Sequence, residues 1–375
     1  MPAKYQVGVY YLGNFHVDPR NVAVHGQGWT EWELVKRALP RFPGHRQPRV
    51  PAWGYEDESD PTVFEKKIDA AADHGVDYFI FDWYWYDDGP FLERALEKGF
   101  MGAKNNKRLK FSLMWANHDW TDIHPQKARQ SPILLYPGKV TVKTWEEMTD
   151  NIVVRYFRHP SYWLIGGCPY FSIYDLHTLI ESFGDVASTR RALDRFRAKV
   201  KNDGFLDLHI NIVMWMHSLL PGETTPGDPQ QLVDDLGFDS VTSYVWVHHA
   251  VMPDFPLTEY TFLRDRYMAY WEQADETYKV PYYPNVTMGW DSSPRTVQSD
   301  MYENIDYPFL PVVAHNSPEA FREALAMTRD RLHRRHGPRI LNINAWNEWT
   351  EGSYIEPDTM FGMGYLDAIK QVFRP

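Results

Sequence analysis

Hydrophobic residues along the chain fall into short, nearly continuous runs that are rich in β-branched and aromatic side chains. Continuous rather than alternating runs are typical of parallel strands covered on both faces. The pattern therefore predicts eight parallel strands. They span residues 7–12, 76–85, 110–117, 170–175, 209–215, 240–246, 282–290 and 340–349.

Amphipathic segments with helix-capping signals lie between these runs. Residues 61–75 have a proline at the start and a glycine at the end, and residues 317–337 open with Ser-Pro and close on basic side chains. Both arrangements match the preferences of helix ends and of the helix dipole. Residues 144–157 begin with Thr144, the expected N-cap, and Glu147 follows three residues later. Strand and helix thus alternate along the chain.

Eight strand–helix units in 375 residues predict one α/β domain over residues 1–375, a (β/α)8 TIM barrel with enlarged βα loops. A doubly wound open sheet is the alternative. It is disfavoured because the chain contains neither GxGxxG nor GxxxxGK[ST]. The breaker-rich stretch 219–229 is short and lies between elements of the same pattern, so we expect a loop and not a domain linker.

Aromatic and polar residues gather where the predicted strands end and not where they begin. In a (β/α)8 barrel these ends share the face that carries active sites. Rings that cover C–H surfaces, together with polar groups that bind hydroxyls, are typical of carbohydrate sites. We therefore expect a carbohydrate site formed by Tyr10, Tyr11, Asp82, Trp83, Trp85, Trp115, Asn117, His118, Asp175, Trp215, His217, Tyr244, Trp246, His248, Trp290, Trp346 and Asn347.

The last predicted strand runs into NAWNEWTEGSYIEPD, residues 344–358. Side chains alternate along a strand, so Asn344, Trp346 and Glu348 should share one face. Glu351 lies just past the strand, and a turn there can bring its carboxyl group toward that of Glu348. The stretch is thus expected to place two carboxyl groups at the rim of one pocket.

Two neighbouring glutamates among aromatic rings have a specific chemical use. Like charges disfavour double ionisation, and burial raises the pKa further. Glycoside cleavage needs one protonated and one ionised carboxyl group. We therefore expect Glu348 and Glu351 to be catalytic, the alternative being that they cap the turn or pair with an arginine. Glu356, directly before a proline, is expected to be structural.

Bulk properties narrow the choice of partner. The net charge of −11 argues against nucleic acid or an anionic membrane. The 15 tryptophans and 23 tyrosines suit a carbohydrate partner as well as a Trp-rich core. No run approaches the roughly 20 apolar residues of a membrane helix, and the first residues lack a signal-peptide pattern. With Cys168 as the single cysteine, we expect a cytoplasmic protein without disulfides.

Histidines near the strand ends raise the possibility of a metal site. Neither HExxH nor CxxC spacing occurs. His248 and His249 are adjacent and would point apart on a strand. We therefore expect no metal and no cofactor, with histidines that bond to sugar hydroxyls.

Four segments together resemble the WbsX-type domain, which is similar to the endo-α-mannosidases of glycoside hydrolase family 99. They are GWTEWELVKRALPRFPGHRQPRVP (28–51), DYFIFDWYWYDD (77–88), LMWANHDWT (113–121) and NAWNEWTEGSYIEPD (344–358). The resemblance spans the chain from the first strand to the last. NEWxEGxxIEP is specific to the whole group, and the GWTEW block is specific to the WbsX-type branch.

The resemblance implies a (β/α)8 barrel and retaining cleavage of α-linked, manno-configured sugars without a protein nucleophile. By motif position, Glu348 would remove the proton from the 2-hydroxyl of the substrate, whose oxygen then displaces the leaving group to give a 1,2-anhydro sugar. Glu351 would protonate the leaving oxygen and then activate water. Many WbsX-type proteins are instead described as glycosyltransferases of surface-polysaccharide assembly.

Three functions therefore compete. The first is a retaining glycoside hydrolase. The second is a glycosyltransferase, which usually needs a diphosphate site such as a DxD metal motif or a basic glycine-rich loop, and neither occurs in the sequence. The third is a non-catalytic glycan-binding barrel, which has no use for paired glutamates. The hydrolase interpretation is favoured.

Overall fold

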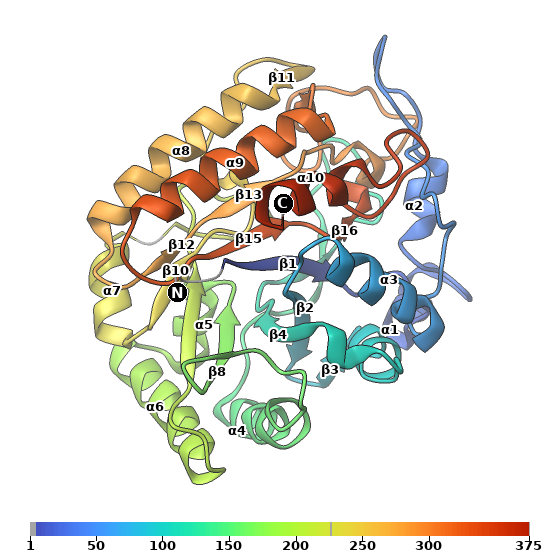
Figure 1. Ribbon diagram of the computed structural model, residues 1–375. Helices are drawn as coiled ribbons and strands as arrows, with labels where there is room; N and C mark the ends of the chain where they lie inside the picture. The colour runs from blue at the N-terminus through green and yellow to red at the C-terminus, as the bar shows by residue number, and fades with distance from the viewer. Residues whose placement is uncertain (1–4, 226, 375) are drawn as a thin grey trace.

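Nine strands of an eleven-stranded sheet pair in parallel, and the other two are short and pair antiparallel with members of the nine. The computed structural model describes residues 5–225 and 227–374; residues 1–4, residue 226, which falls in the predicted loop, and residue 375 lie outside the described part. In spatial order the strands are β12 (Tyr282–Tyr283), β10 (Ser240–Thr242), β9 (His209–Val213), β8 (Cys168–Ile173), β4 (Lys110–Trp115), β2 (Tyr78–Tyr86), β1 (Gln6–Leu12), β15 (Ile340–Asn344) and β13 (Asn285–Thr287). The sheet curls into a nearly closed barrel (Figure 1).

The predicted (β/α)8 barrel is confirmed, with one strand divided. The seventh predicted strand, 282–290, is β12 and β13 separated by Pro284. β12 pairs with β10 while β13 pairs with β15, so the two halves form the two ends of the curled sheet. Proline has no N–H to donate, which explains why the ladder is interrupted there.

Helices surround the strands (Figure 1). They are α1 (Pro19–His25), α2 (Trp32–Arg37), α3 (Pro61–Asp73), α4 (Val142–Ile152), α5 (Leu176–Phe183), α6 (Val186–Asn202), α7 (Pro229–Leu236), α8 (Tyr260–Thr277), α9 (Pro318–Arg334) and α10 (Gly364–Phe373). The three predicted helices correspond to α3, α4 and α9. The expected N-cap of α4 was wrong: Thr141 caps it and accepts a hydrogen bond from the Thr144 amide, because the helix begins earlier.

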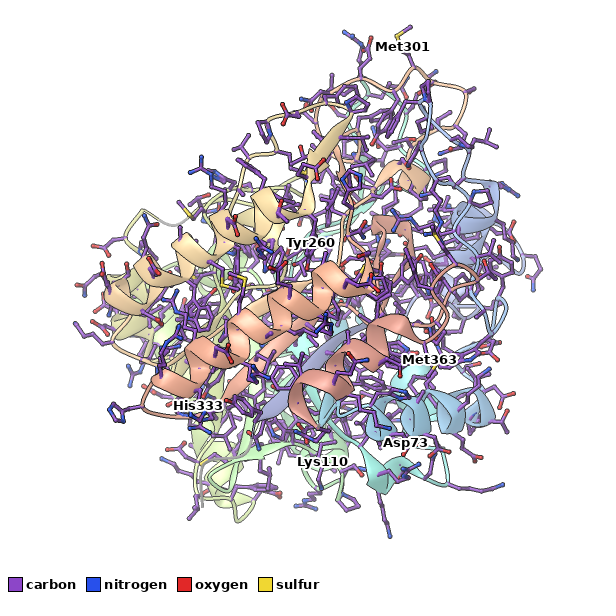
Figure 2. The ribbon with its side chains drawn as sticks, turned by 45° about the horizontal axis from the view of Figure 1, so that its top comes forward. Asp73, Lys110, Tyr260, Met301, His333 and Met363 are labelled. Carbon is purple, nitrogen blue, oxygen red and sulfur yellow. The ribbon has the colours of Figure 1, made fainter. Side chains whose placement is uncertain are left out.

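The long connections lie at the carboxyl ends of the strands. They carry short strands of their own, including β3 (Gly89–Phe91), β5 (Trp120–Asp122), β6 (Ile133–Tyr136), β11 (Leu257–Glu259), β14 (Val312–Ala314), β16 (Asn347–Glu348) and β17 (Ser353–Tyr354). Figure 2 shows Lys110, at the start of β4, and Met301, in a connection beyond β13, at opposite ends of the molecule. Within the described residues, every helix is too short or too polar to cross a membrane.

Candidate active site

A cavity of about 730 Å³, part of it open to solvent, lies at the carboxyl ends of the strands. Both glutamates of the NEWTE stretch are in its wall, with side chains only 5 and 6% exposed. The other lining residues include Leu12, Asp82, Tyr84, Met114, His118, Trp120, His124, Tyr174, Leu219, Leu220, Pro221, Tyr244, His248, Trp290 and Arg295. The cavity thus combines aliphatic, aromatic and ionisable side chains.

A tight turn places the two glutamates together. Glu348 ends β16, a single turn of 3-10 helix covers Trp349–Glu351, and Gly352 follows in the left-handed region with φ 63°. A Cβ atom on Gly352 would lie 2.6 Å from Cβ of Asp291, so a glycine is needed there. The expected turn is therefore present, and it brings Glu351 to the same cavity as Glu348.

Arg295 links the two carboxylates to each other. A guanidinium group has five N–H donors, and in Arg295 all five are used. Nε donates to Thr350 Oγ1 at 2.8 Å, Nη1 to Tyr307 Oη at 2.5 Å and Glu351 Oε1 at 2.6 Å, and Nη2 to Glu31 Oε1 at 3.0 Å and Glu348 Oε2 at 3.3 Å. No donor is left for a ligand, so Arg295 positions the carboxylates and stabilises their charge.

The charges around Arg295 do not allow every carboxylate to be ionised. Burial opposes ionisation of Glu31, but Arg295 and His124 together with hydrogen bonds from Thr350 and Asn14 outweigh burial and lower the pKa of Glu31. Burial, then the charge of Glu351, raises the pKa of Glu348 well above its ordinary value. Burial also raises the pKa of Glu351, although Arg295 and Tyr307 oppose the rise. Because Glu31 also binds Arg295, burial and mutual repulsion favour a proton on the Glu348–Glu351 pair.

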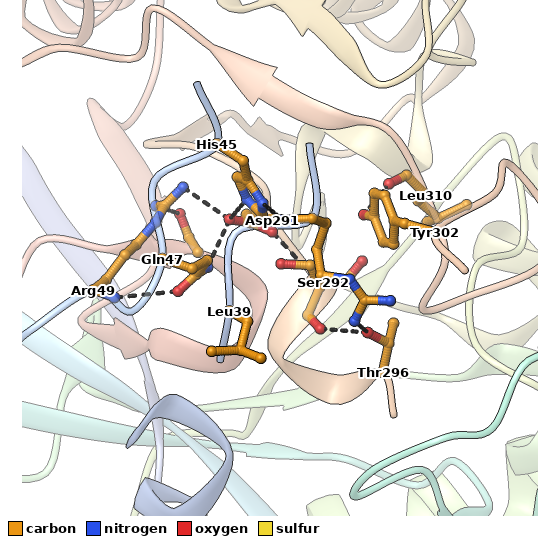
Figure 3. A network of polar contacts seen from close by, with 12 residues as sticks. Leu39, His45, Gln47, Arg49, Asp291, Ser292, Thr296, Tyr302 and Leu310 are labelled. Carbon is orange, nitrogen blue, oxygen red and sulfur yellow. Dashed lines mark hydrogen bonds and ion pairs between the residues drawn. The ribbon is translucent and has the colours of Figure 1, made fainter. Parts of the chain in front are cut away.

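The segment of residues 28–51, which begins with GWTEW, packs behind the turn that carries Glu348 and Glu351. Figure 3 shows the side chains of His45, Gln47 and Arg49 converging on Asp291. Their nitrogens lie 2.9, 2.7 and 3.3 Å from Oδ2 of Asp291. Burial alone would raise the pKa of Asp291. The hydrogen bond from His45 and the charge of Arg49 nevertheless hold this pKa well below its usual range. The Asp291 amide donates to the Glu351 carbonyl oxygen at 2.5 Å, which connects the segment to the turn that carries Glu348 and Glu351.

Some of the predicted sugar-contacting residues do line the cavity. They are Asp82, His118, Tyr244, His248 and Trp290. They lie on β2 or in the connections that follow β4, β10 and β13, and they meet at one face, as the barrel topology requires. Their contact with a sugar stays a prediction.

The structure places several predicted tryptophans and one tyrosine on the opposite side of the sheet, so their prediction as cavity residues was wrong. Successive side chains of a strand face opposite sides, and these face the helices. Trp346 also packs outward because β15 ends at Asn344 and the alternation does not continue beyond it. The contacts are Tyr11 with Phe64, Trp83 with Tyr156, Trp115 with Trp145, Trp246 with Tyr260 and Trp346 with Phe79.

The remaining predicted residues lie near the cavity without lining it, or away from it. Tyr10 is fully buried inside the barrel, with its ring 4.7 Å from that of Tyr244. The other placements have equally local causes. The side-chain amides of Asn347 and Asn117 bond to the backbones of Leu12 and Asp175, and Asp175 itself caps α5. Trp215 packs behind Tyr174, and Trp85 is half-buried beside Trp83. His217 is exposed.

Other lining residues were missed by the sequence analysis. Tyr84 could have been found, because it lies two residues after Asp82 on the same strand and shares its face. The same alternation predicts that Trp83, which lies between them, points away from the cavity. Arg295 ends a single turn of 3-10 helix and His124 lies in a loop, and neither segment has a periodicity that indicates which side chains point inward.

The two kinds of tryptophan can be separated by mutation. Trp290 lines the cavity, and its Nε1 has no hydrogen-bond partner among the described residues. Trp290→Phe keeps a ring and removes the donor, so we expect glycan affinity to fall about five- to tenfold, the effect of one hydrogen bond. Trp115→Ala should instead lower the free energy of unfolding by about 3–5 kcal/mol. Titration calorimetry and urea unfolding check the pair; unchanged affinity in Trp290→Phe would remove this ring from the binding surface.

Comparison with known proteins identifies the family to which the chain belongs. The family model described as "Glycosyltransferase WbsX" matches residues 7–369. Proteins described as "Uncharacterized protein WxcX", from two strains of Xanthomonas campestris pv. campestris, are 30% identical over 380 residues, which is 96% of this chain and 48% of theirs. The chain therefore spans about half the length of the curated relatives it matches.

Solved structures with the same fold include glycoside hydrolases. A structure described as "Glycoside hydrolase-like protein" superposes with a TM-score of 0.66 at 14% identity, covering 100% of this chain and 95% of that chain. The GH99 endo-α-mannosidase from Bacteroides thetaiotaomicron superposes with a TM-score of 0.54 at 16% identity, covering 98 and 96%. At such identities the likeness establishes the fold alone.

Proposed function

The chain belongs to the WbsX family, and from that premise we propose that it is a retaining glycoside hydrolase acting on an α-linked, manno-configured oligo- or polysaccharide. One observation carries the proposal: two buried glutamates are held by one arginine in the wall of one cavity, where burial raises the pKa of both. Glycoside cleavage needs such a pair of one acid and one base. A purely sugar-binding barrel would gain nothing from burying it.

We assign the roles as the family resemblance implies. Glu348 accepts the proton of the substrate 2-hydroxyl, and that oxygen attacks C1 while the glycosidic bond breaks, which forms a 1,2-anhydro sugar. Glu351 gives its proton to the leaving oxygen. It then takes a proton from the water that attacks C1, while the C1–O2 bond breaks and Glu348 returns its proton to O2. An axial 2-hydroxyl trans to an axial leaving group is aligned for this attack, and its intramolecular position supplies much of the effective concentration.

The contacts of Glu348 and Glu351 differ. Arg295 is closer to Glu351, at 2.6 Å, than to Glu348, at 3.3 Å, and the Tyr244 hydroxyl oxygen lies 2.9 Å from Glu348. The roles require a proton on Glu351 and an ionised Glu348 when substrate is bound. A sugar 2-hydroxyl that donates to Glu348 stabilises its ionised form.

The family description, glycosyltransferase, makes transfer the second candidate function. Arg295 is the sole Lys or Arg among the described lining residues, and its donors are all engaged. Among all the residues that the structure describes, no cluster of three or more His, Cys, Asp or Glu side chains could hold a metal ion. These features do not supply the diphosphate site that a sugar-nucleotide donor usually needs, which supports hydrolysis over transfer.

The decisive experiment is a substrate screen that follows products by NMR. α-Mannosides, α-rhamnosides and a panel of bacterial polysaccharides are incubated with the protein, and the first-formed anomer is recorded. We expect free sugar or oligosaccharide with the α configuration retained. Inversion, or product formed only when a nucleotide sugar is added, would exclude the proposed reaction.

We expect turnover to be independent of divalent cations. Dialysis against EDTA should leave kcat/KM within about twofold, because carboxyl groups and Arg295 supply the acid, the base and the charge compensation. The same dialysed protein supplemented with Mg²⁺ or Mn²⁺ is the control. Activity lost on dialysis and restored by either ion would instead support metal-dependent transfer.

A further inference from the structure

The hydroxyl group of Tyr244 lies between two carboxyl groups in the cavity wall. Its oxygen is 2.9 Å from Oδ2 of Asp82 and 2.9 Å from Oε1 of Glu348. The three side chains are 4–8% exposed, and all three line the cavity. Both contacts have the length of ordinary hydrogen bonds.

Counting hydrogens shows that this trio carries an extra proton. A tyrosine hydroxyl has one hydrogen to donate, and an ionised carboxylate can only accept. Tyr244 therefore donates to one carboxylate, and the other carboxyl group must donate to Tyr244. Two ionised carboxylates at 2.9 Å from the same hydroxyl would leave one pair of oxygens facing each other without a hydrogen.

The surroundings indicate which carboxyl group holds that proton. Glu348 has Arg295 at 3.3 Å, whereas Asp82 forms no ion pair within the described residues. Oδ1 of Asp82 has no hydrogen-bond partner there either. Burial raises the pKa of Asp82 well above its ordinary value, and Tyr244 offsets only part of the rise. The ionisable groups that act on Asp82 and Glu348 are Tyr10, Glu31, Tyr84, Tyr244, Arg295 and Glu351.

We propose that Asp82 is a proton-bearing partner of the catalytic base: its neutral carboxyl group donates to Tyr244, and Tyr244 donates to ionised Glu348. No bond to the substrate is made or broken in this chain of donors. Its effect is to stabilise negative charge on Glu348, so that Glu348 can accept the 2-hydroxyl proton. Neutral carboxylic acids kept as donors in apolar sites are known in enzymes.

The inference deepens the proposed function and rests on it for the role of Glu348. It also explains how Glu348 can be ionised although Glu351 is close and Arg295 is shared. Asp82 and Tyr244 are thus positioning residues that act through Glu348. The unpartnered Oδ1 of Asp82 remains available to accept a hydrogen bond from a sugar hydroxyl.

Two substitutions of Asp82 separate a neutral donor from an ionised group. Asp82→Asn keeps the shape and can donate from its amide to Tyr244, so we expect kcat/KM to fall by no more than about tenfold. Asp82→Ala and Tyr244→Phe both break the chain of donors and should lower kcat/KM about 10²- to 10³-fold, as loss of a preorganised donor does.

The pH profile gives a readout that a general structural defect would not move. Loss of the donor raises the pKa of Glu348, and the base must be ionised to work. The acid limb of kcat/KM should therefore shift to higher pH in Asp82→Ala and Tyr244→Phe and stay in place in Asp82→Asn. An Asp82→Asn variant as impaired as Asp82→Ala would show that Asp82 works ionised, and would overturn the proposal.

A measurement without substrate keeps this inference separate from the proposed function. Infrared difference spectra of the free protein at neutral pH should contain a C=O band from protonated Asp82 beside that of the Glu348–Glu351 pair. The Asp82 band should persist in Glu348→Gln and be lost in Asp82→Asn. Identical spectra of wild type and Asp82→Asn in this region would overturn the inference even if the protein cleaves glycans. A band with this behaviour in a protein that cleaves no glycan would leave the inference standing and remove the proposed function.

Discussion

Glu348→Gln and Glu351→Gln should each lower the rate of glycan cleavage by about 10³- to 10⁴-fold, because each removes a group to which the proposed mechanism assigns a proton transfer. Glutamine has nearly the same shape and keeps hydrogen-bonding capacity, so circular dichroism and the unfolding midpoint should stay close to wild type. The exposed Glu147→Gln is a matched control with unchanged rate. Turnover close to wild type in either variant would contradict the assignment of the pair.

Leaving-group dependence distinguishes the two glutamates. Glu351→Gln should recover most of its rate on a glycosyl fluoride or nitrophenyl glycoside, because a good leaving group needs no proton. Glu348→Gln should remain slow on both, because the 2-hydroxyl still has to lose its proton. The opposite pattern would exchange the roles of Glu348 and Glu351.

The pH dependence of the wild type follows from the raised pKa values of the pair. The form with one shared proton is active, so kcat/KM should be bell-shaped. Activity falls at low pH when the base gains a proton, and at high pH when the acid loses its proton. Since burial raises the pKa of both glutamates, both limbs should lie above the pH at which an exposed glutamate titrates.

Arg295→Met should produce the largest loss of stability among single substitutions in the cavity wall. The change leaves Glu31 ionised in a fully buried position, together with two partly compensated glutamates. Removing one partner of a buried ion pair lowers the free energy of unfolding by about 3–5 kcal/mol. Urea unfolding measures this loss, and kcat/KM should fall with it because the glutamates lose their common contact.

Two further variants test whether uncompensated charge causes the loss of stability in Arg295→Met. Arg129→Met removes an exposed pair with Glu303 and should change stability by only about 0–1 kcal/mol. Glu31→Gln added to Arg295→Met should restore part of the stability, because it removes the uncompensated charge. If the double variant were no more stable than Arg295→Met, packing and not charge would account for the loss.

Hydrophobic patterning was sufficient for the barrel because it depends on local periodicity. Buried parallel strands need continuous apolar runs, and each predicted run contains a strand of the sheet. The division at Pro284 was also visible in the sequence, although the pattern alone predicted one strand over 282–290. The same alternation, applied to Asp82, predicts the inward position of Tyr84 and the outward position of Trp83.

The partners of the glutamates could not be predicted in this way. Arg295 lies 53 residues from Glu348 and 264 from Glu31, and all three meet at one guanidinium group. His45, Gln47 and Arg49 reach Asp291 from a segment that lies 242 to 246 residues earlier in the chain. Loop side chains have no period that indicates their direction, so their contacts depend on the packing of the whole barrel.

The sequence by itself determined the parallel barrel and the delivery of two glutamates by one short turn, because periodicity and close spacing act over a few residues. Only the tertiary structure decided which rings face the cavity, which cation holds the glutamates and that Asp82 and Glu348 share one hydroxyl. Those outcomes depend on side chains from distant segments that compete for the same buried donors, and that competition exists only after the chain has folded.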